Sequence, residues 1–172
     1  NKQYANQTTY IHVQARHIKN PEDVRKIFNG ARIYTPCVLF FEDIDLIAGT
    51  DRQTKPDVKN ELMQQLSGLE SLKGVLVIGT TNTFDTIDDA LKRSKRLGYH
   101  FEIGLPVFED RKNLLEIFLS KYDYDINLVD FASKTEGMTG ADLKELVENS
   151  YLRAQELDST IITDQILNET LT

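Results

Sequence analysis

Apolar residues follow two different spacings along this chain, and the spacings predict alternating strands and helices. Continuous apolar runs and two-residue alternation predict β-strands. Four stretches have this pattern: Thr9–Gln14, Cys37–Phe41, Val75–Asn82 and Tyr99–Gly104. Between them, apolar residues recur every three or four positions, which is the spacing of an amphipathic helix.

The expected helices have defined starts and apolar faces. Asn20 is expected to cap the first helix, with Pro21 in its first turn and the acids Glu22 and Asp23 at the positive end of the helix dipole. One face of this helix is apolar: Val24, Ile27, Phe28 and Ala31. The second helix has a similar stripe: Val58, Leu62, Leu66 and Leu69. A basic stretch, Asp88–Gly98, is expected to be helical as well.

Strand and helix in alternation are typical of crossover connections that build a parallel sheet. After Pro106 the pattern changes, and only helices are expected. They lie in three places: around Leu114–Phe118, at Leu128–Ala132 and from Ala141 to Leu157. Thr139 and Asp142 form a capping-box pattern before the last helix. The sequence thus predicts an α/β domain over residues 1–105 and a smaller helical domain over residues 106–172.

The expected strand at Cys37–Phe41 runs directly into two acids, Glu42 and Asp43. Parallel strands that are buried on both faces are near-continuous apolar runs, and α/β proteins bind ligands at the carboxyl ends of such strands. Glu42 and Asp43 are therefore candidates for a ligand site. The alternative is a core strand whose polar end only caps the edge of the sheet.

Composition narrows the class of protein. With 40% hydrophobic and 27% charged residues, the chain is expected to be a soluble globular protein without a membrane span. Its formal net charge of −7 argues against a nucleic-acid-binding surface. Cys37 is the only cysteine, so we expect no internal disulfide and a reducing, cytoplasm-like compartment. The three histidines, which include His12, form no ligand cluster with the acids in the sequence and are interpreted as structural or surface residues.

Four stretches, taken in order, resemble the AAA+ ATPase family and its classical AAA clade. Cys37–Gly49 (CVLFFEDIDLIAG) is similar to the Walker B region, and Gly74–Leu91 (GVLVIGTTNTFDTIDDAL) to the sensor-1 strand. Leu91–Pro106 (LKRSKRLGYHFEIGLP) resembles the segment that contains the arginine fingers, and Thr135–Leu146 (TEGMTGADLKEL) resembles the sensor-2 region. The resemblance covers about residues 5–157 and implies a parallel-sheet, P-loop NTPase-like core followed by a small all-α lid.

The resemblance also implies roles for individual residues. Glu42 would hold Mg²⁺, Asp43 would activate the attacking water, and Asn82 would orient that water. Arg93 and Arg96 would be the arginine fingers that act on a neighbouring subunit, although a solvated basic turn is the alternative for such a cluster. The implied cofactors are ATP and Mg²⁺.

Two further points concern the lid and the acids. Gly140 and Ala141 open the lid helix at the position where the family contacts nucleotide. The Glu42-Asp43 order reverses the usual Asp-Glu order of the family, which permits hydrolysis but leaves a slowed or lost reaction open.

The chain also departs from the family in two segments. The glycine-rich P-loop motif G-x-x-x-x-G-K-[ST] is absent from the sequence, and the chain is expected to begin just downstream of it, without the first strand. We therefore expect a piece of a longer ATPase that is inactive alone, with a naturally degenerate module as the alternative. The segment Ala15–Val24 is short and contains no aromatic residue, so the usual threading of substrate through pore loops is in doubt.

These observations predict an AAA+ ATPase module that couples ATP hydrolysis to the remodelling or assembly of protein partners in an oligomeric ring, by resemblance a hexamer. The alternative is a non-catalytic AAA-like subunit or scaffold that supplies Arg93 and Arg96 to a neighbouring ATPase. A nucleic-acid motor is disfavoured by the net charge and by the resemblance to protein-remodelling members.

Overall fold

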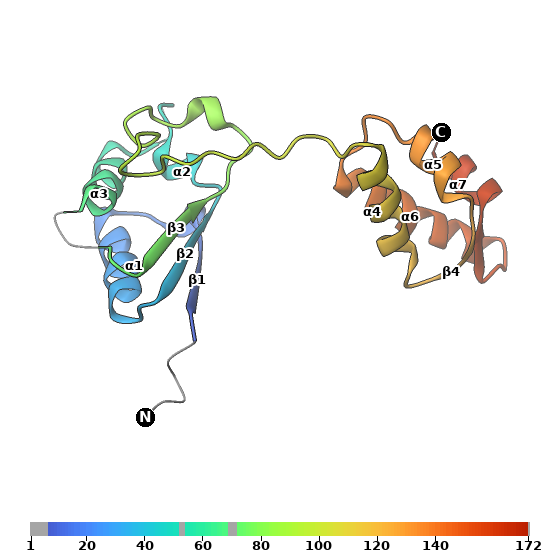
Figure 1. The fold of residues 1–172 in the computed structure, drawn as a ribbon, viewed down its shortest axis with the longest axis horizontal. Coiled ribbons are helices and arrows are strands. Elements are labelled where there is room, and N and C mark those ends of the chain that lie inside the picture. Colours follow the sequence, from blue (N-terminus) through green and yellow to red (C-terminus); the bar gives the residue numbers. More distant parts are fainter. Residues whose placement is uncertain (1–6, 52–53, 69–71, 172) are drawn as a thin grey trace. The chain divides into compact units, whose positions relative to one another are not determined.

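The computed structural model describes residues 7–51, 54–68 and 72–171, which divide into two units, Asn1–Phe101 and Glu102–Thr172 (Figure 1). Each unit has its own hydrophobic core. The domain boundary expected at Pro106 stays a prediction. Within the described residues, no helix combines the length and the apolar character that crossing a bilayer requires.

The first unit is built on a parallel sheet of three strands in the order β1-β2-β3. The strands are β1 (Thr9–Gln14), β2 (Cys37–Glu42) and β3 (Val75–Gly79). Three of the four expected strands and the parallel pairing are therefore confirmed. β2, the central strand, is the apolar run that ends in the acid pair.

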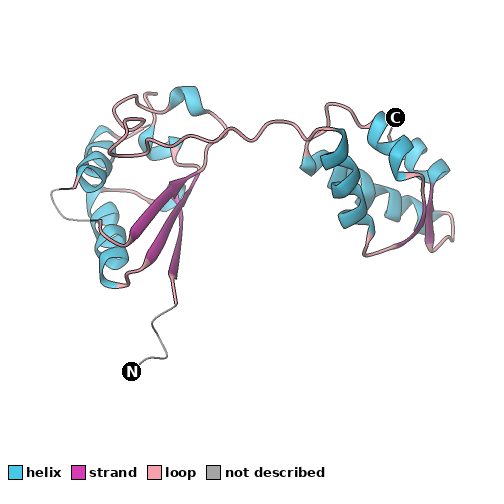
Figure 2. Cartoon of the chain, viewed as in Figure 1, coloured by secondary structure: helices cyan, strands magenta, loops and turns pink. Residues whose placement is uncertain are grey.

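Two long helices, α1 (Pro21–Ile33) and α3 (Pro56–Ser67), lie on one face of this sheet, and the short α2 (Asp45–Ala48) follows β2 (Figure 2). The expected cap of α1 is confirmed: the Asp23 amide donates to the Asn20 side chain, and the Asn20 amide donates to the Asp23 carboxylate. Among the described residues, no helix covers the opposite face, where Tyr10 and Leu76 are exposed.

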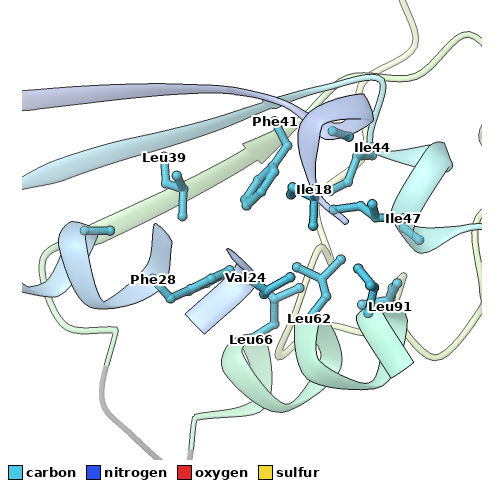
Figure 3. Packing of buried hydrophobic residues seen from close by; sticks show 14 of the residues in the cluster. Ile18, Val24, Phe28, Leu39, Phe41, Ile44, Ile47, Leu62, Leu66 and Leu91 are labelled. Carbon is cyan, nitrogen blue, oxygen red and sulfur yellow. The ribbon is translucent and has the colours of Figure 1, made fainter. Parts of the chain in front are cut away.

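The core of the first unit fills the space between the sheet and its helices (Figure 3). Phe28 of α1 stacks on Phe41 of β2, and Leu62 and Leu66 of α3 pack beneath them as the helical stripe predicted. Leu69 lies outside the described residues. Cys37 is buried, and burial raises the pKa of its thiol.

One buried acid joins the two long helices. Glu61 of α3 is only 5% exposed, and it accepts hydrogen bonds from Arg25 of α1 at 2.8 and 3.0 Å and from Gln65 at 2.8 Å. Burial raises the pKa of Glu61, but the bonds from Arg25 and Gln65 outweigh that effect, so the net shift is downward.

The expected strand at Tyr99–Gly104 is not formed, and this prediction was wrong. Its alternating side chains are almost fully exposed, at 89% for Tyr99, 90% for Phe101 and 96% for Ile103. A strand requires a hydrogen-bonded partner as well as an alternating sequence. Among the described residues, no strand lies beside this segment to supply those bonds.

The expected helix at Asp88–Gly98 is also absent, and turns replace it. The Asp88 side chain accepts a hydrogen bond from the Ala90 amide, and the Leu97 amide donates to the Leu91 carbonyl, which closes a loop. Aspartate side chains compete with the helix for backbone amides in this way. Hydrogen bonds within the loop therefore replace the helical bonds that the sequence predicted.

The second unit consists mainly of helices: α4 (Phe108–Leu119), α5 (Leu128–Lys134), α6 (Gly140–Glu156) and α7 (Asp164–Thr170). The Thr139–Asp142 capping box at the start of α6 is confirmed. The expectation that only helices follow Pro106 is wrong in one detail, because β4 (Asp123–Asp125) and β5 (Ile161–Thr163) form a short parallel pair. Three residues per strand are too few to give a periodic signal in the sequence.

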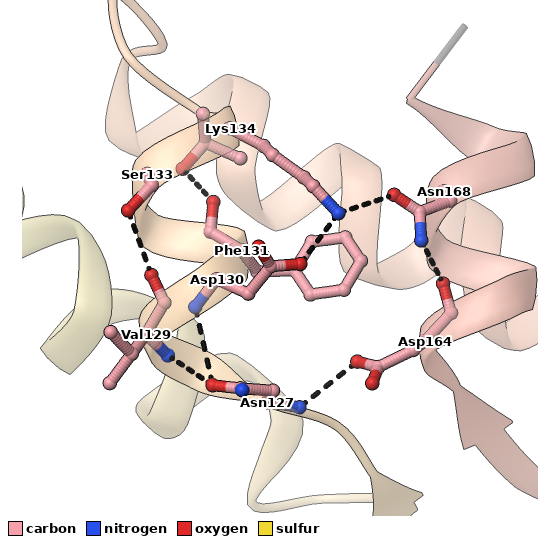
Figure 4. Close-up of polar contacts among 9 residues, drawn as sticks. Asn127, Val129, Asp130, Phe131, Ser133, Lys134, Asp164 and Asn168 are labelled. Atoms are coloured by element: carbon pink, nitrogen blue, oxygen red, sulfur yellow. Dashed lines mark hydrogen bonds and ion pairs between the residues drawn. The ribbon is translucent and has the colours of Figure 1, made fainter.

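Polar contacts fix α5 against α7 in this unit (Figure 4). The Asn127 side chain caps α5, while the Asn127 amide donates to Asp164 at the start of α7 at 2.9 Å. Lys134 at the end of α5 donates to both Asp130 and Asn168. The second unit therefore has specific polar contacts between its helices.

We expect Glu61→Gln to lower the free energy of unfolding of the first unit by about 1–2 kcal/mol at neutral pH, because it removes the charge from a charge-assisted hydrogen bond. The expected loss is modest because Glu61 is buried but Arg25 is half-exposed, and solvent screens the pair. The pKa of Glu61 lies below its ordinary value of 4.5, so the stabilisation is complete above that value and is lost as the pH falls further. Urea unfolding followed by amide signals of α1 and α3 measures both effects. Glu22→Gln is the matched control, since Glu22 is an exposed partner of the same arginine; an equal loss in both variants contradicts the prediction.

Candidate functional site

Three of the predicted site residues lie at the carboxyl edge of the sheet. Glu42 is the last residue of β2, and Asp43 follows it. Hydrogen bonding to β3 continues past the acids, because the Ile44 amide donates to the Thr80 carbonyl at 2.9 Å and the Thr80 amide donates to the Phe41 carbonyl at 2.9 Å. Asn82 lies two residues beyond Thr80, so the acids and this amide lie at the same end of adjacent strands.

Asp43 has an unusual backbone conformation, with φ at +54°. This left-handed region is costly for most side chains, and aspartate is among the few that adopt it more readily. The turn is possible because Ile44 packs tightly against Gly79, where an added Cβ would approach Ile44 Cδ1 to 2.8 Å. The result is that Ile44 is buried in the core while Asp43 is exposed to solvent.

Glu42 is half-exposed, and one of its carboxylate oxygens is already engaged. His12 Nε2 of β1 lies 3.2 Å from Glu42 Oε2. His12 was expected to be a structural or surface residue, and sequence reasoning missed this contact. The two residues lie thirty positions apart, and only the register of β1 against β2 reveals their proximity.

The carboxylate oxygens at this edge fit a magnesium ion that binds to the protein and to a second molecule at the same time. No group of three or more metal-ligating side chains occurs among the described residues, so a closed protein-only metal site is absent from that part of the chain. Mg²⁺ does not need such a site, because it retains several waters and typically binds one or two carboxylates together with substrate phosphates. Glu42 and Asp43 supply hard oxygen ligands of this kind.

Asn82 lies in a loop whose backbone is fixed by threonine side chains. The Thr83 amide donates to Thr81 Oγ1 at 2.9 Å, and Thr86 Oγ1 donates to the Thr83 carbonyl at 2.8 Å. Asn82 itself is exposed between these contacts. Its amide group is therefore available to a ligand at the same edge as the acids.

The loop that contains the two predicted arginines is fastened to α3 at both ends. Lys59 of α3 donates to Asp88 at 2.8 Å, and this bond, followed by one from the Ala90 amide, lowers the pKa of Asp88. Arg96 Nε donates to Ser67 Oγ at 2.7 Å at the end of the same helix. Leu91 is fully buried between these two attachments.

Arg93 and Arg96 differ in what they contact. Arg96 also donates from NH1 to the Ala90 carbonyl at 2.5 Å, so its guanidinium closes the loop on itself. Arg93 lies at the exposed turn of the loop. Sequence reasoning could not separate the two, because the difference depends on the position of α3.

Gly140 and Ala141 belong to the second unit, where they form the first turn of α6. The fold does not require a glycine at position 140, since an added Cβ would meet only Leu114 Cδ1 at 3.8 Å, an ordinary contact. A close approach of a ligand to the backbone is the other common reason for a glycine at a helix start.

Comparison with known proteins agrees with this geometry. The model of the "ATPase family associated with various cellular activities (AAA)" matches residues 3–105, and that of the AAA+ lid domain matches residues 125–169. The chain is 37% identical over 139 residues to the peroxisomal ATPase PEX1 of Komagataella phaffii, covering 77% of this chain and 12% of the relative.

Two further relatives show the same partial coverage. The chain is 36% identical over 143 residues to the cell division cycle protein 48 homologue of Archaeoglobus fulgidus, and the match covers 79% of this chain and 20% of that protein. It is 29% identical over 157 residues to the ATP-dependent zinc metalloprotease FtsH of Mycoplasma pneumoniae, and the match covers 86% of this chain and 22% of that protein. The chain thus spans about a fifth or less of the length of these relatives. The parallel sheet with its acid edge, the helical lid and these matches together place the chain in the AAA family of ATPases.

Proposed function

We propose that this chain is part of an AAA+ ATPase that hydrolyses ATP to remodel or assemble protein partners. The observation that supports this most directly is the edge at which Glu42, Asp43 and Asn82 lie, in a chain that matches both the AAA domain and its lid. Its place in a reducing compartment stays a prediction.

The chemistry assigns a different task to each residue of the edge. A Mg²⁺ ion bound with ATP would supply positive charge that offsets the negative charge of the phosphates. The Glu42 side chain is longer than that of Asp43, and one of its carboxylate oxygens contacts His12. Both features would suit contact with the water shell of the metal. Asp43, which is exposed, would polarise the attacking water, and Asn82 in the loop after β3 would orient that water.

We further propose that the active form is a ring, with a hexamer as the expected state. Arg93 and Arg96 would then approach the nucleotide of a neighbouring subunit. Arginine suits this task, because its planar group binds two phosphate oxygens and keeps its charge. The exposed turn at Arg93 and the attachment of its loop to α3 support a rigid presentation of this kind.

The proposed partner class is a protein, by analogy with the ATP-dependent zinc metalloprotease FtsH, whose name states that it acts on protein. Between β1 and α1 the chain has only a short 3₁₀ turn, Ala15–His17, and no aromatic residue. This favours a ring that moves or assembles partners over one that threads polypeptide. The reversed acid order keeps a second candidate open, a subunit that supplies its arginines without turnover.

Replacing Asp43 tests the proposed catalytic acid. In the full-length protein, Asp43→Asn should keep Mg-ATP binding and lower turnover by at least about a hundredfold, because an amide cannot accept a proton from water. Asparagine also tolerates the left-handed backbone, so the melting temperature should be unchanged. Glu42→Gln should instead raise the Mg²⁺ concentration that is needed. Wild-type turnover in Asp43→Asn contradicts the assignment and makes Asp45 the next candidate.

Replacing Arg93 tests the proposed ring contact. Arg93→Ala should lower turnover on the order of 10³-fold while nucleotide affinity and stability stay near those of the wild type, because Arg93 is exposed in the isolated chain. Arg96→Ala should in addition lower the melting temperature, since it removes the bonds to Ser67 and Ala90. Mixing Arg93→Ala with Asp43→Asn should restore part of the activity. Mixed rings without any recovery would exclude action between subunits.

Replacing Gly140 tests whether the lid contacts nucleotide. Gly140→Ala should leave the second unit as stable as before, since the new methyl group has an ordinary contact distance to Leu114. If the α6 backbone lies against ATP in the full-length protein, the same change should weaken ATP binding severalfold. Titration with a fluorescent ATP analogue and a melting curve measure the two effects, and unchanged affinity rules out close contact.

A further inference from the structure

The His12 side chain lies on the sheet face that no described helix covers, within a row of aromatic rings. Its imidazole is 5.5 Å from the Phe40 ring and 6.4 Å from the Tyr10 ring, measured between centroids. Tyr10 and Phe40 are themselves 6.2 Å apart. These two neighbours limit the orientations of the imidazole, and the observed orientation directs Nε2 toward Glu42.

The register of β1 and β2 explains why His12 is the residue that reaches Glu42. In the parallel ladder Gln14 is the direct neighbour of Glu42, and His12 is the neighbour of Phe40. Gln14 is already engaged, because Arg16 donates to its side-chain oxygen at 2.9 and 3.3 Å. His12 lies diagonally across from Glu42 on the same face, within reach of a long side chain.

The contact has a specific consequence for a glutamate at position 42. Glutamate has one more rotatable bond than aspartate, so its carboxylate samples more positions unless another group restrains it. His12 Nε2 restrains Oε2 at 3.2 Å. The second oxygen, Oε1, forms no hydrogen bond or ion pair with another described residue, so it can accept one from a metal-bound water.

We propose that His12 is a positioning residue that holds the Glu42 carboxylate in the orientation needed to bind the water shell of Mg²⁺. The inference rests on the proposed function, since it assumes that Glu42 contacts the metal. Groups that hydrogen-bond to metal-binding carboxylates commonly affect metal affinity tenfold or more. Both side chains here are about half-exposed, so a smaller effect is expected.

His12→Phe in the full-length protein is the decisive variant, because phenylalanine retains the packing against Tyr10 and Phe40 but has no hydrogen-bond donor. Binding of a fluorescent ATP analogue is measured against Mg²⁺ concentration and again in EDTA. We expect the Mg²⁺ concentration at half-saturation to rise roughly three- to tenfold, with metal-free affinity unchanged. Leu76→Ala is the matched control, because it shortens an exposed apolar side chain on the same sheet face at a β3 position that pairs with Val38, and it should leave the Mg²⁺ dependence unchanged.

A double-mutant cycle separates positioning from a general effect on the sheet. In a Glu42→Asp background the shorter side chain no longer reaches His12, so His12→Phe should have no further effect. An equal shift in both backgrounds overturns the inference, as does a shift of less than twofold in His12→Phe while Glu42→Gln still alters the Mg²⁺ dependence. If the wild-type protein shows no Mg²⁺-dependent nucleotide binding, the proposed function itself fails, and that result is distinct from the others.

Discussion

The parallel pairing of β2 between β1 and β3 is the constraint on which the candidate site depends. Parallel strands end at a common edge, so the acids at the end of β2, the loop with Asn82 after β3 and the end of β1 lie on the same side of the sheet. The apolar run of β2 is buried by α1 and α3, which fixes its register. A shift by one residue would exchange the faces of Phe41 and Glu42 and disrupt both the core and the acid edge.

Helix α3 connects the remaining parts of the first unit. Its Glu61 binds Arg25 of α1, its Lys59 binds Asp88, and its last residue, Ser67, accepts a hydrogen bond from Arg96. The same helix therefore packs on the sheet and holds the arginine loop, which has no regular secondary structure of its own. A change in the position of α3 would affect the core and the loop together.

The sequence predicted those helices and strands in which burial against a core sets the spacing of the apolar residues. The stripe of Val58, Leu62 and Leu66 and the run of β2 were found because each faces one core. Tyr99–Gly104 was predicted wrongly because alternation reports the character of side chains and not the presence of a partner strand. The His12–Glu42 contact and the difference between Arg93 and Arg96 depend on tertiary neighbours, which local sequence does not encode.

The uncovered face of the sheet also bears on association between copies of this chain. Tyr10 is 61% and Leu76 58% exposed on that face, and among the described residues β3 has no partner along its outer edge. Exposed apolar sheet surface and open strand edges favour association between molecules. We therefore expect this face and the outer edge of β3 to favour association between copies of the 172-residue chain, against the mutual repulsion that a net charge of −7 produces.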